Sequence, residues 1–331
     1  MNFGLNDEQQ EIKSTAKQFL ESRFKPDVVR ELAEEGRYDD ALWQEICDLG
    51  WPGIAIAEEN GGQGLGMVEL AILCEELGYA CAPIPFLSNA AAGLMIEAAG
   101  DEKQRARWLP GIASGEARGA AAMERGKEAV IVPDAEGAAV LVLPAAEGGV
   151  LVEPSEAELE RLDLLDTTRG YYRVSASGGD PLGSGHEGAQ RAMVALAAEL
   201  TGLAQRALDM SVAYAKEREQ FDRPIGAYQA VSHALARMLY DVEEARSLTY
   251  YAAWAADAEP DSLPLAAAMA KARASEAAWD VTKAAIQAHG GIGFTWEHDL
   301  HFLLKRARAD GQMFGTASEH RERIAGMVGM A

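Results

Sequence analysis

The chain has 331 residues, 48% of them hydrophobic, and a formal net charge of −22 from 30 basic and 52 acidic side chains. This composition predicts a globular protein with a large core and excludes a disordered chain, and the acidic excess argues against nucleic acid or an anionic membrane surface as a partner. The polar N-terminus has no signal-peptide pattern and no apolar run approaches the length of a membrane span, so we expect no membrane association and a cytoplasmic protein.

The first third of the chain has the pattern of a series of short helices. Asn6 or Asp7 is a suitable N-cap for the first helix, and Gly50 is placed to end another. The glycine-rich stretch Gly61–Gly66 lies between two predicted helices and not after a strand, so it predicts a turn and not a dinucleotide-binding loop. We expect an all-α N-terminal domain over residues 1–116.

The middle of the chain has the pattern of short strands. Val130–Val132, Ala139–Leu143 and Val150–Val152 are β-rich runs separated by Pro, Gly, Asp and Glu, and "GYYRVSASGG" indicates a fourth strand. We expect a β domain over residues 117–184. A β region of about 65 residues buries too little core to be stable alone, so it must pack on its helical neighbours.

Long amphipathic helices dominate the rest of the chain. Apolar residues recur at steps of three and four from Met193 and again from Tyr228, as in the seam of a helical bundle. An alanine-rich segment starts near Pro264 and stops at Gly290, and "DLHFLLKRARAD" predicts a fourth helix. The predicted fold class is mainly α with a small β insert, in which residues 185–331 form a four-helix bundle.

The segment "REQFDRPIG" interrupts two of these helices. Arg218 and Arg223 lie at the break, where a helix end and a planar guanidinium can bind a phosphate. A solvated turn with ordinary surface charges is the alternative, and the residue types alone favour that alternative.

The segment "QAHGGIGF" carries the less ordinary pattern. Three glycines in four residues, Gly290, Gly291 and Gly293, follow a long helix. A helix C-cap accounts for one glycine, whereas close approach of the backbone to a ligand accounts for all three. His289 alone is more typical of a structural histidine than of a catalytic base. No catalytic triad, zinc-protease or P-loop motif is present, and the three cysteines lack metal-ligand spacing, so we expect no metal site.

Together these segments resemble the acyl-CoA dehydrogenase family over nearly the full chain. The specific similarities are "GWPGIAIAEENGGQGLGMVELAILCEELGYACAP", "WLPGIASGEARGAAAM", "REQFDRPIGAYQAV" and "QAHGGIGFTWEHDL". The resemblance implies α,β-desaturation of an acyl-CoA thioester with FAD, in which a glutamate removes the α-proton. It also implies contacts to the pyrophosphate and adenosine half of an FAD held mainly by the neighbouring subunit. The residues for those contacts are Arg218, Phe221, Gln229, Gln287, Gly290, Gly291 and Gly293.

The chain departs from the family pattern where the chemistry is expected. In the ungapped tail match Met313–Ala317, Gly315 stands at the position of the catalytic glutamate. Some members place the base in the first bundle helix, and Ala192 occupies that position here, with Glu187 facing another direction. The β domain is short, "ERGKEAV" replaces a loop that holds the flavin ring, and a second ring-flanking segment is absent. Asp222 replaces a usual glycine.

This pattern of losses resembles the shorter, non-catalytic subunit of actinobacterial heteromeric acyl-CoA dehydrogenases. It implies an α2β2 assembly with a longer catalytic partner, FAD at the interface, and an acyl-CoA substrate such as a steroid side-chain thioester. One alternative is a homomeric dehydrogenase with a relocated base, for which Asp310 and Glu319 are candidates. Another is a flavin-free scaffold or binding protein of the same fold.

Overall fold

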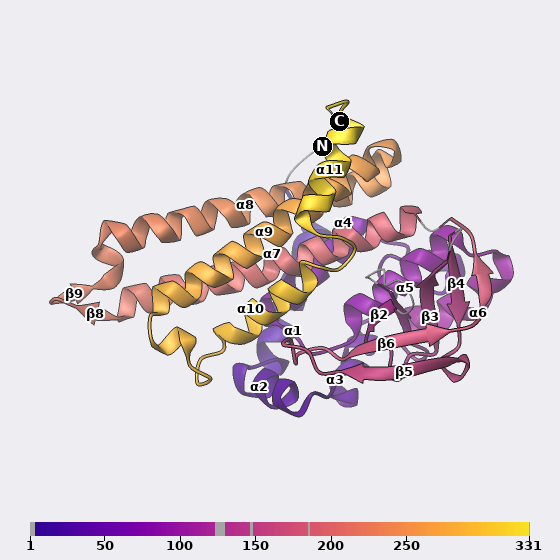
Figure 1. Ribbon diagram of the computed structural model, residues 1–331, viewed down its shortest axis with the longest axis horizontal. Helices are drawn as coiled ribbons and strands as arrows, with labels where there is room; N and C mark the ends of the chain where they lie inside the picture. The colour runs from indigo at the N-terminus through magenta and orange to yellow at the C-terminus, as the bar shows by residue number, and fades with distance from the viewer. Residues whose placement is uncertain (1–3, 123–129, 146–147, 185, 331) are drawn as a thin grey trace.

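The computed structural model describes residues 4–122, 130–145, 148–184 and 186–330. Its N-terminal part is helical, as predicted, and packs on one side of a long helical bundle (Figure 1). The helices are α1 (Asp7–Arg23), α2 (Pro26–Glu35), α3 (Asp40–Asp48), α4 (Met67–Ala80), α5 (Phe86–Ala99) and α6 (Glu102–Ser114). Asn6 is the N-cap of α1, where its side chain and that of Gln9 form a capping box.

The glycine-rich connection between α3 and α4 is a tight turn. It contains the 3-10 turns η1 (Trp51–Gly53) and η2 (Glu58–Asn60). A Cβ atom on Gly62 would stand 2.0 Å from the carbonyl oxygen of Ile56, so only glycine fits there. This stretch lies between helices, as predicted, and no strand precedes it among the described residues.

The strands of the middle region form two small sheets beside α5 and α6 (Figure 1). One sheet has the order β1-β3-β4-β7, with β1 (Gly119–Ala121), β3 (Val140–Pro144), β4 (Gly149–Val152) and β7 (Asp180–Leu182). The other has the order β2-β6-β5, with β2 (Val130–Pro133), β6 (Tyr171–Ala176) and β5 (Ala157–Leu162). The predicted runs became β2, β3, β4 and β6. The strand β5 is polar and largely exposed, and its pairing with β6 is a tertiary effect that the sequence pattern did not show.

The C-terminal part contains the predicted bundle. Its helices are α7 (His186–Glu217), α8 (Gln229–Ala258), α9 (Leu263–His289) and α10 (Leu300–Asp310). The connection between α7 and α8 is a small hairpin of β8 (Glu219–Gln220) and β9 (Arg223–Pro224), followed by the 3-10 turn η4 (Ile225–Ala227). A further helix, α11 (Ala317–Met327), begins after the tail segment and was not predicted.

One core joins the N-terminal helices to the bundle. The apolar seam of α7 is buried from Met193 to Ala207. The helices α4 and α7 cross closely, because a Cβ on Gly202 would lie 1.9 Å from the Glu75 carbonyl oxygen and one on Gly78 would lie 2.1 Å from that of Glu199. These observations confirm the predicted fold class, mainly α with a small β insert. Within the described part of the chain, none of the helices combines the length and apolarity that crossing a membrane requires.

Candidate functional site

The end of the bundle that carries the β8–β9 hairpin brings the two predicted ligand segments together. Tyr214, one turn before the end of α7, stacks on His289 in the last turn of α9 with ring centroids 4.4 Å apart. Arg218 directly follows α7, and Gln229 is the first residue of α8. Both side chains are exposed at this end of the molecule, as is Gln287 on α9. The contact between α7 and α9 therefore places Arg218 on the same surface as the loop between α9 and α10, residues 290–299, which we call the glycine-rich loop.

The hairpin itself holds an unusual turn. Phe221 and Asp222 occupy its two central positions with φ values of 55° and 62°, although neither is glycine. A turn with both central residues at positive φ normally selects Asn-Gly or Asp-Gly, so this backbone is strained. The turn projects Phe221, whose side chain is 87% exposed. Backbone strain of this kind clusters at active sites and ligand-binding segments.

The glycines after α9 have two different physical reasons. Gly290 has a φ of 62°, and a Cβ on Gly290 or on Gly291 would meet nothing within 4 Å. Open space beside both residues leaves the backbone accessible to a ligand. Gly293 is instead required by packing, since its Cβ would lie 2.8 Å from Cβ of His289.

His289 has the structural role that the sequence favoured. Its side chain is buried, and Nδ1 lies 2.8 Å from the carbonyl oxygen of Ala285. Its ring also contacts His298, with centroids 4.6 Å apart. Burial lowers the pKa of His289, so the ring is neutral at pH 7. The ring contacts of His289 with Tyr214 and His298 therefore hold the glycine-rich loop against the bundle.

A large cavity lies on the other side of the bundle, against the β region. Its volume is about 940 Å³, within the range of small-molecule sites. Strands β3, β4 and β7, helix α5, the start of α7, the segment after α10 and helix α11 form its walls. Apolar walls include Met95, Val142 and Met193, and polar groups include His186 and Arg323.

Gly315 lines this cavity and has a backbone conformation that only glycine adopts readily. Its φ is 104°, well outside the regions that side chains tolerate. A Cβ there would point to Glu319 Oε2 and His320 Nε2, each at 3.4 Å. At the position where the resemblance places the catalytic glutamate, the chain therefore has no side chain and a backbone conformation that favours glycine. Ala192 is fully buried and does not line the cavity, whereas Gln190 on the same helix does.

Glu319 is the only carboxylate among the described residues that line the cavity. Its Oε2 accepts hydrogen bonds from the backbone N–H of Thr316 at 2.6 Å and from its hydroxyl at 2.9 Å, which makes a capping box at the start of α11. These hydrogen bonds lower the pKa of Glu319, and a low pKa makes a carboxylate a poor base.

Asp310, the other candidate for a relocated base, belongs to a buried ion network. Its Oδ1 accepts from Arg169 at 2.9 Å, and Arg169 also donates to Glu199 at 2.7 Å. Arg306 bonds the same Glu199 oxygen at 3.3 Å. Burial raises the pKa of Asp310, and the residue is not among those that line the cavity. This network joins the β region to α7 and α10, so its role is structural.

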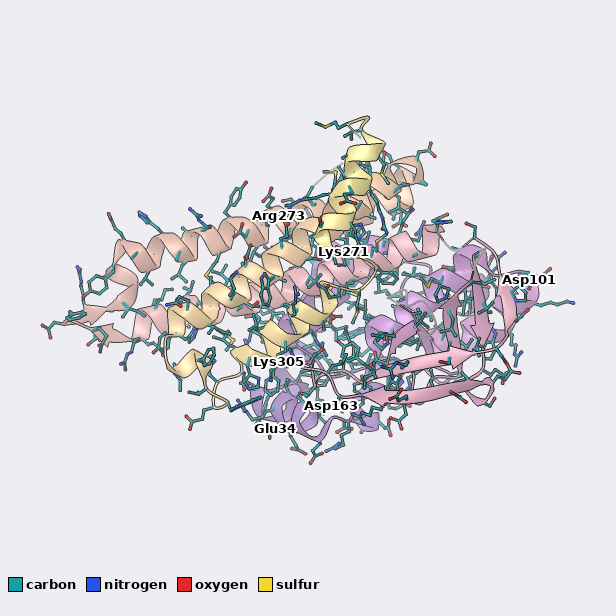
Figure 2. The ribbon with its side chains drawn as sticks, in the orientation of Figure 1. Glu34, Asp101, Asp163, Lys271, Arg273 and Lys305 are labelled. Atoms are coloured by element: carbon teal, nitrogen blue, oxygen red, sulfur yellow. The ribbon has the colours of Figure 1, made fainter. Side chains whose placement is uncertain are left out.

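Lys271 holds the segment between α10 and α11 through hydrogen bonds, and the sequence analysis did not single it out. It is fully buried in α9, and Nζ donates to Ser275 Oγ at 2.8 Å and to the carbonyl oxygens of Gly311 and Gly315 at 3.2 Å each (Figure 2). Burial lowers its pKa to about 7. The signal was present in the sequence, because Lys271 is a lone charge on the alanine-rich face of a predicted helix.

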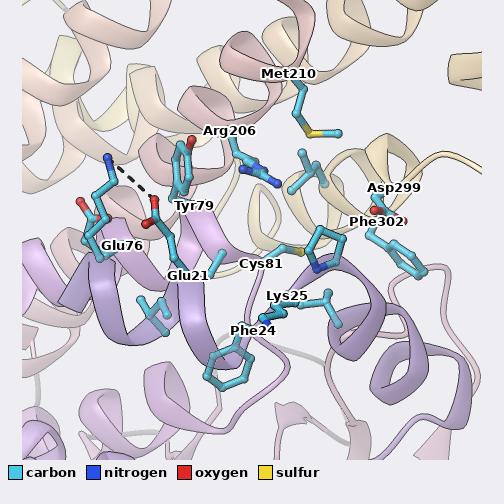
Figure 3. Close-up of a pocket in the computed structure, with 16 residues that line it drawn as sticks. Glu21, Phe24, Lys25, Glu76, Tyr79, Cys81, Arg206, Met210, Asp299 and Phe302 are labelled. Atoms are coloured by element: carbon cyan, nitrogen blue, oxygen red, sulfur yellow. Dashed lines mark ion pairs between the residues drawn. The ribbon is translucent and has the colours of Figure 1, made fainter. Parts of the chain in front are cut away.

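A second cavity lies between α1, α4, α7 and α10 (Figure 3). Its volume is about 200 Å³, below the usual range for a cofactor or an acyl thioester. Two of its polar groups already have partners, since Lys17 pairs with Glu21 at 3.9 Å and the Tyr79 hydroxyl donates to Asp209 at 3.0 Å. We therefore assign no site to it.

Comparison with known proteins agrees with this architecture. Family models for the acyl-CoA dehydrogenase N-terminal and C-terminal domains match residues 6–116 and 187–328. Acyl-CoA dehydrogenase IpdE2 of Mycobacterium tuberculosis is 34% identical over 326 residues, which span 97% of this chain and 98% of that protein.

Two solved structures are similar over nearly their full length. A variant of the Tcur3481–Tcur3483 steroid ACAD has a TM-score of 0.90 and 29% identity, over 98% of each chain. A chain of the ChsE4–ChsE5 complex from Mycobacterium tuberculosis has a TM-score of 0.89 and 24% identity over 100% of each chain, which supports the fold alone. The two family models and the IpdE2 match confirm the family resemblance seen in the motifs. The chain belongs to the acyl-CoA dehydrogenase family.

Proposed function

We propose that this chain is the base-lacking subunit of a heteromeric, FAD-dependent acyl-CoA dehydrogenase. It contributes nucleotide-binding residues to a flavin held mainly by a longer partner that carries the catalytic glutamate. The observation that carries this proposal is the cavity at Gly315. The described residues around it offer no free carboxylate, and the backbone conformation at Gly315 disfavours any residue other than glycine.

The bundle end fits the nucleotide half of FAD. Arg218 presents an exposed guanidinium for a pyrophosphate, and the open backbone at Gly290 and Gly291 allows close approach. Gln229 and Gln287 present carboxamides that can bond to ribose or adenine. FAD, when bound, supplies the hydride acceptor for α,β-desaturation of the acyl thioester. The replaced ring-holding loop predicted near 124–130 falls mostly outside the described residues.

Exposed aromatic side chains support a partner at this end. Phe221 on the hairpin, Tyr240 on α8, and Phe294 and Trp296 in the glycine-rich loop are each more than half exposed. Aromatic residues of this kind are enriched in protein interfaces. The relatives' names add that Tcur3481–Tcur3483 and ChsE4–ChsE5 are each pairs, and that the first is a steroid enzyme. We therefore propose an α2β2 assembly and a steroid side-chain thioester as the substrate class.

The described geometry argues against the two alternatives. A homomeric enzyme with a relocated base would need a free carboxylate at the cavity, but Glu319 caps α11 and Asp310 is buried with Arg169. A flavin-free scaffold would have no use for an open glycine backbone beside an exposed arginine.

The test compares the lone chain with the chain co-expressed beside a longer relative whose tail motif has a glutamate. We expect little flavin on the lone chain, and about one flavin per pair of unlike chains in the complex. Arg218→Met should lower the flavin content of the complex. Lys216→Met, which removes an exposed charge two residues away on α7, should not. Full flavin and dehydrogenase activity in the lone chain would disprove the proposal.

A further inference from the structure

The glycine-rich loop between α9 and α10 is also held from outside the bundle, by one side chain of the N-terminal domain. Arg30 on α2 donates from Nη1 to the carbonyl oxygen of Trp296 at 2.6 Å and from Nη2 to that of Glu297 at 3.2 Å. Nη2 also donates to Asp299 Oδ1. These bonds connect residues more than 260 positions apart in the sequence.

The surroundings of Arg30 fix its orientation. Its side chain is 26% exposed, and its guanidinium lies over the ring of Phe302 with 5.5 Å to the centroid. A planar guanidinium presents several N–H donors in a rigid fork, so it can bond two carbonyls and a carboxylate at once. Lysine cannot reproduce that arrangement, because its ammonium is a single point of donation.

The loop is thus fastened at two places. His289 is one anchor, since its ring stacks on Tyr214 and meets His298 edge to face, and its Cβ packs against Gly293. Arg30 is the other anchor, and it bonds residues 296–299, which follow the short 3-10 turn η6 (Ile292–Phe294). Gly290 and Gly291, whose backbone is open to a ligand, lie before this turn, between α9 and the residues that Arg30 bonds.

We propose that Arg30 is a positioning residue for the flavin nucleotide, acting through the glycine-rich loop. It keeps the loop ordered before the pyrophosphate and adenosine bind, so less conformational entropy is lost on binding. This inference rests on the proposed function, since it assigns the nucleotide to this loop. It adds that the N-terminal domain of one subunit sets the affinity of a flavin that the partner holds.

Three variants test the role of Arg30. Arg30→Met removes all its bonds to the loop, and Arg30→Lys keeps the charge but loses the fork. Arg37→Met is the matched control, since Arg37 follows α2 and forms exposed ion pairs with Glu31 and Glu35. Hydrogen–deuterium exchange of residues 291–299 in the lone chain reports the anchor, and the Kd for FAD of the co-expressed complex reports its consequence.

We expect faster exchange of the loop in Arg30→Met, with α7 and α9 unchanged, and a Kd for FAD about tenfold higher. At saturating FAD, kcat should stay at the wild-type value, because Arg30 touches no reacting group. Arg30→Lys should lie between, and it carries the test if Arg30→Met does not fold. Arg37→Met should match the wild type in both measurements.

Two results would overturn the positioning role and leave the proposed function standing. Unchanged loop exchange would show that Arg30 does not order the loop. Faster exchange with an unchanged Kd for FAD would show that Arg30 is structural only, and the proposed function would stand. Absence of flavin from the wild-type complex would instead refute the proposed function itself, and the positioning role with it, whatever the exchange data show.

Discussion

Replacing Gly315 by glutamate tests whether the cavity beside it needs only a carboxylate to become active, or whether the backbone there also opposes a side chain. Gly315 has a φ of 104°, which lies beyond the left-handed well near 57°. Holding a non-glycine residue there costs roughly 1–3 kcal/mol. Contacts add little, because the atoms nearest to a Cβ at this position would lie 3.4 Å away, an ordinary van der Waals distance. The loss of stability therefore comes from the backbone conformation, so alanine and glutamate at this position should lower the free energy of unfolding equally.

The assay measures the free energy of unfolding in urea for Gly315→Ala and Gly315→Glu. We expect both to lose roughly 1–3 kcal/mol. Gly326→Ala in α11 is the matched control, since Gly326 has no positive φ and a Cβ there meets nothing within 4 Å. That variant should be neutral or up to about 1 kcal/mol more stable, because alanine favours helix.

Activity provides the second part of this test. The lone Gly315→Glu chain, mixed with acyl-CoA thioesters and a dye acceptor, should show no dehydrogenase activity. Its new side chain would point toward Glu319 and His320, and the proposed function predicts that the lone chain holds little flavin. The reasoning would be refuted by a Gly315→Ala variant as stable as the wild type, or by dye reduction with the lone Gly315→Glu chain.

Three further predictions concern stability and flavin binding. The folded pKa of Lys271, about 7, lies below its ordinary value of 10.5, so between these pH values the unfolded chain binds more protons and the free energy of unfolding rises with pH. The rise amounts to up to about 1.4 kcal/mol per pH unit. It should disappear in Lys271→Met when urea unfolding is measured from pH 7 to 8.5. Gly291→Ala should keep the wild-type stability but lower the flavin content of the complex, whereas Gly293→Ala should lower both, as thermal melts and flavin absorbance would show. Arg169→Met leaves buried carboxylates unpaired and should cost about 3–5 kcal/mol in urea unfolding, against less than about 1 kcal/mol for Arg173→Met at an exposed pair, and equal losses would contradict a structural role for the buried network.

The sequence predicted the helical parts because their signals are local. The three- and four-residue steps of apolar side chains from Met193 set the buried face of α7, and Asn6 capped α1 as its residue type predicts. Glycines also carried information, since the "QAHGGIG" run marked a loop whose backbone is open at Gly290 and Gly291. The family resemblance, which the family models confirm, followed from motifs of this local kind.

Other features depended on contacts between distant segments, which no local pattern encodes. The exposed strand β5 exists through its pairing with β6. The helix α11 is a different case, since its capping box from Thr316 to Glu319 is a local signal that the prediction did not use. The sequence left Asp310 open as a base, but its place was decided by Arg169, which lies 141 positions away in the chain.

Arg30 shows the same limit at the candidate site. Its type and its place on a surface helix predict an ordinary solvated charge, whereas folding brings it to the carbonyls of Trp296 and Glu297. The sequence by itself determined most of the helices and the family motifs, because propensity, capping and motif identity act over a few residues. Only the tertiary structure decided which charges are buried and which loop is held, since burial and hydrogen bonding depend on segments that meet after the chain has folded.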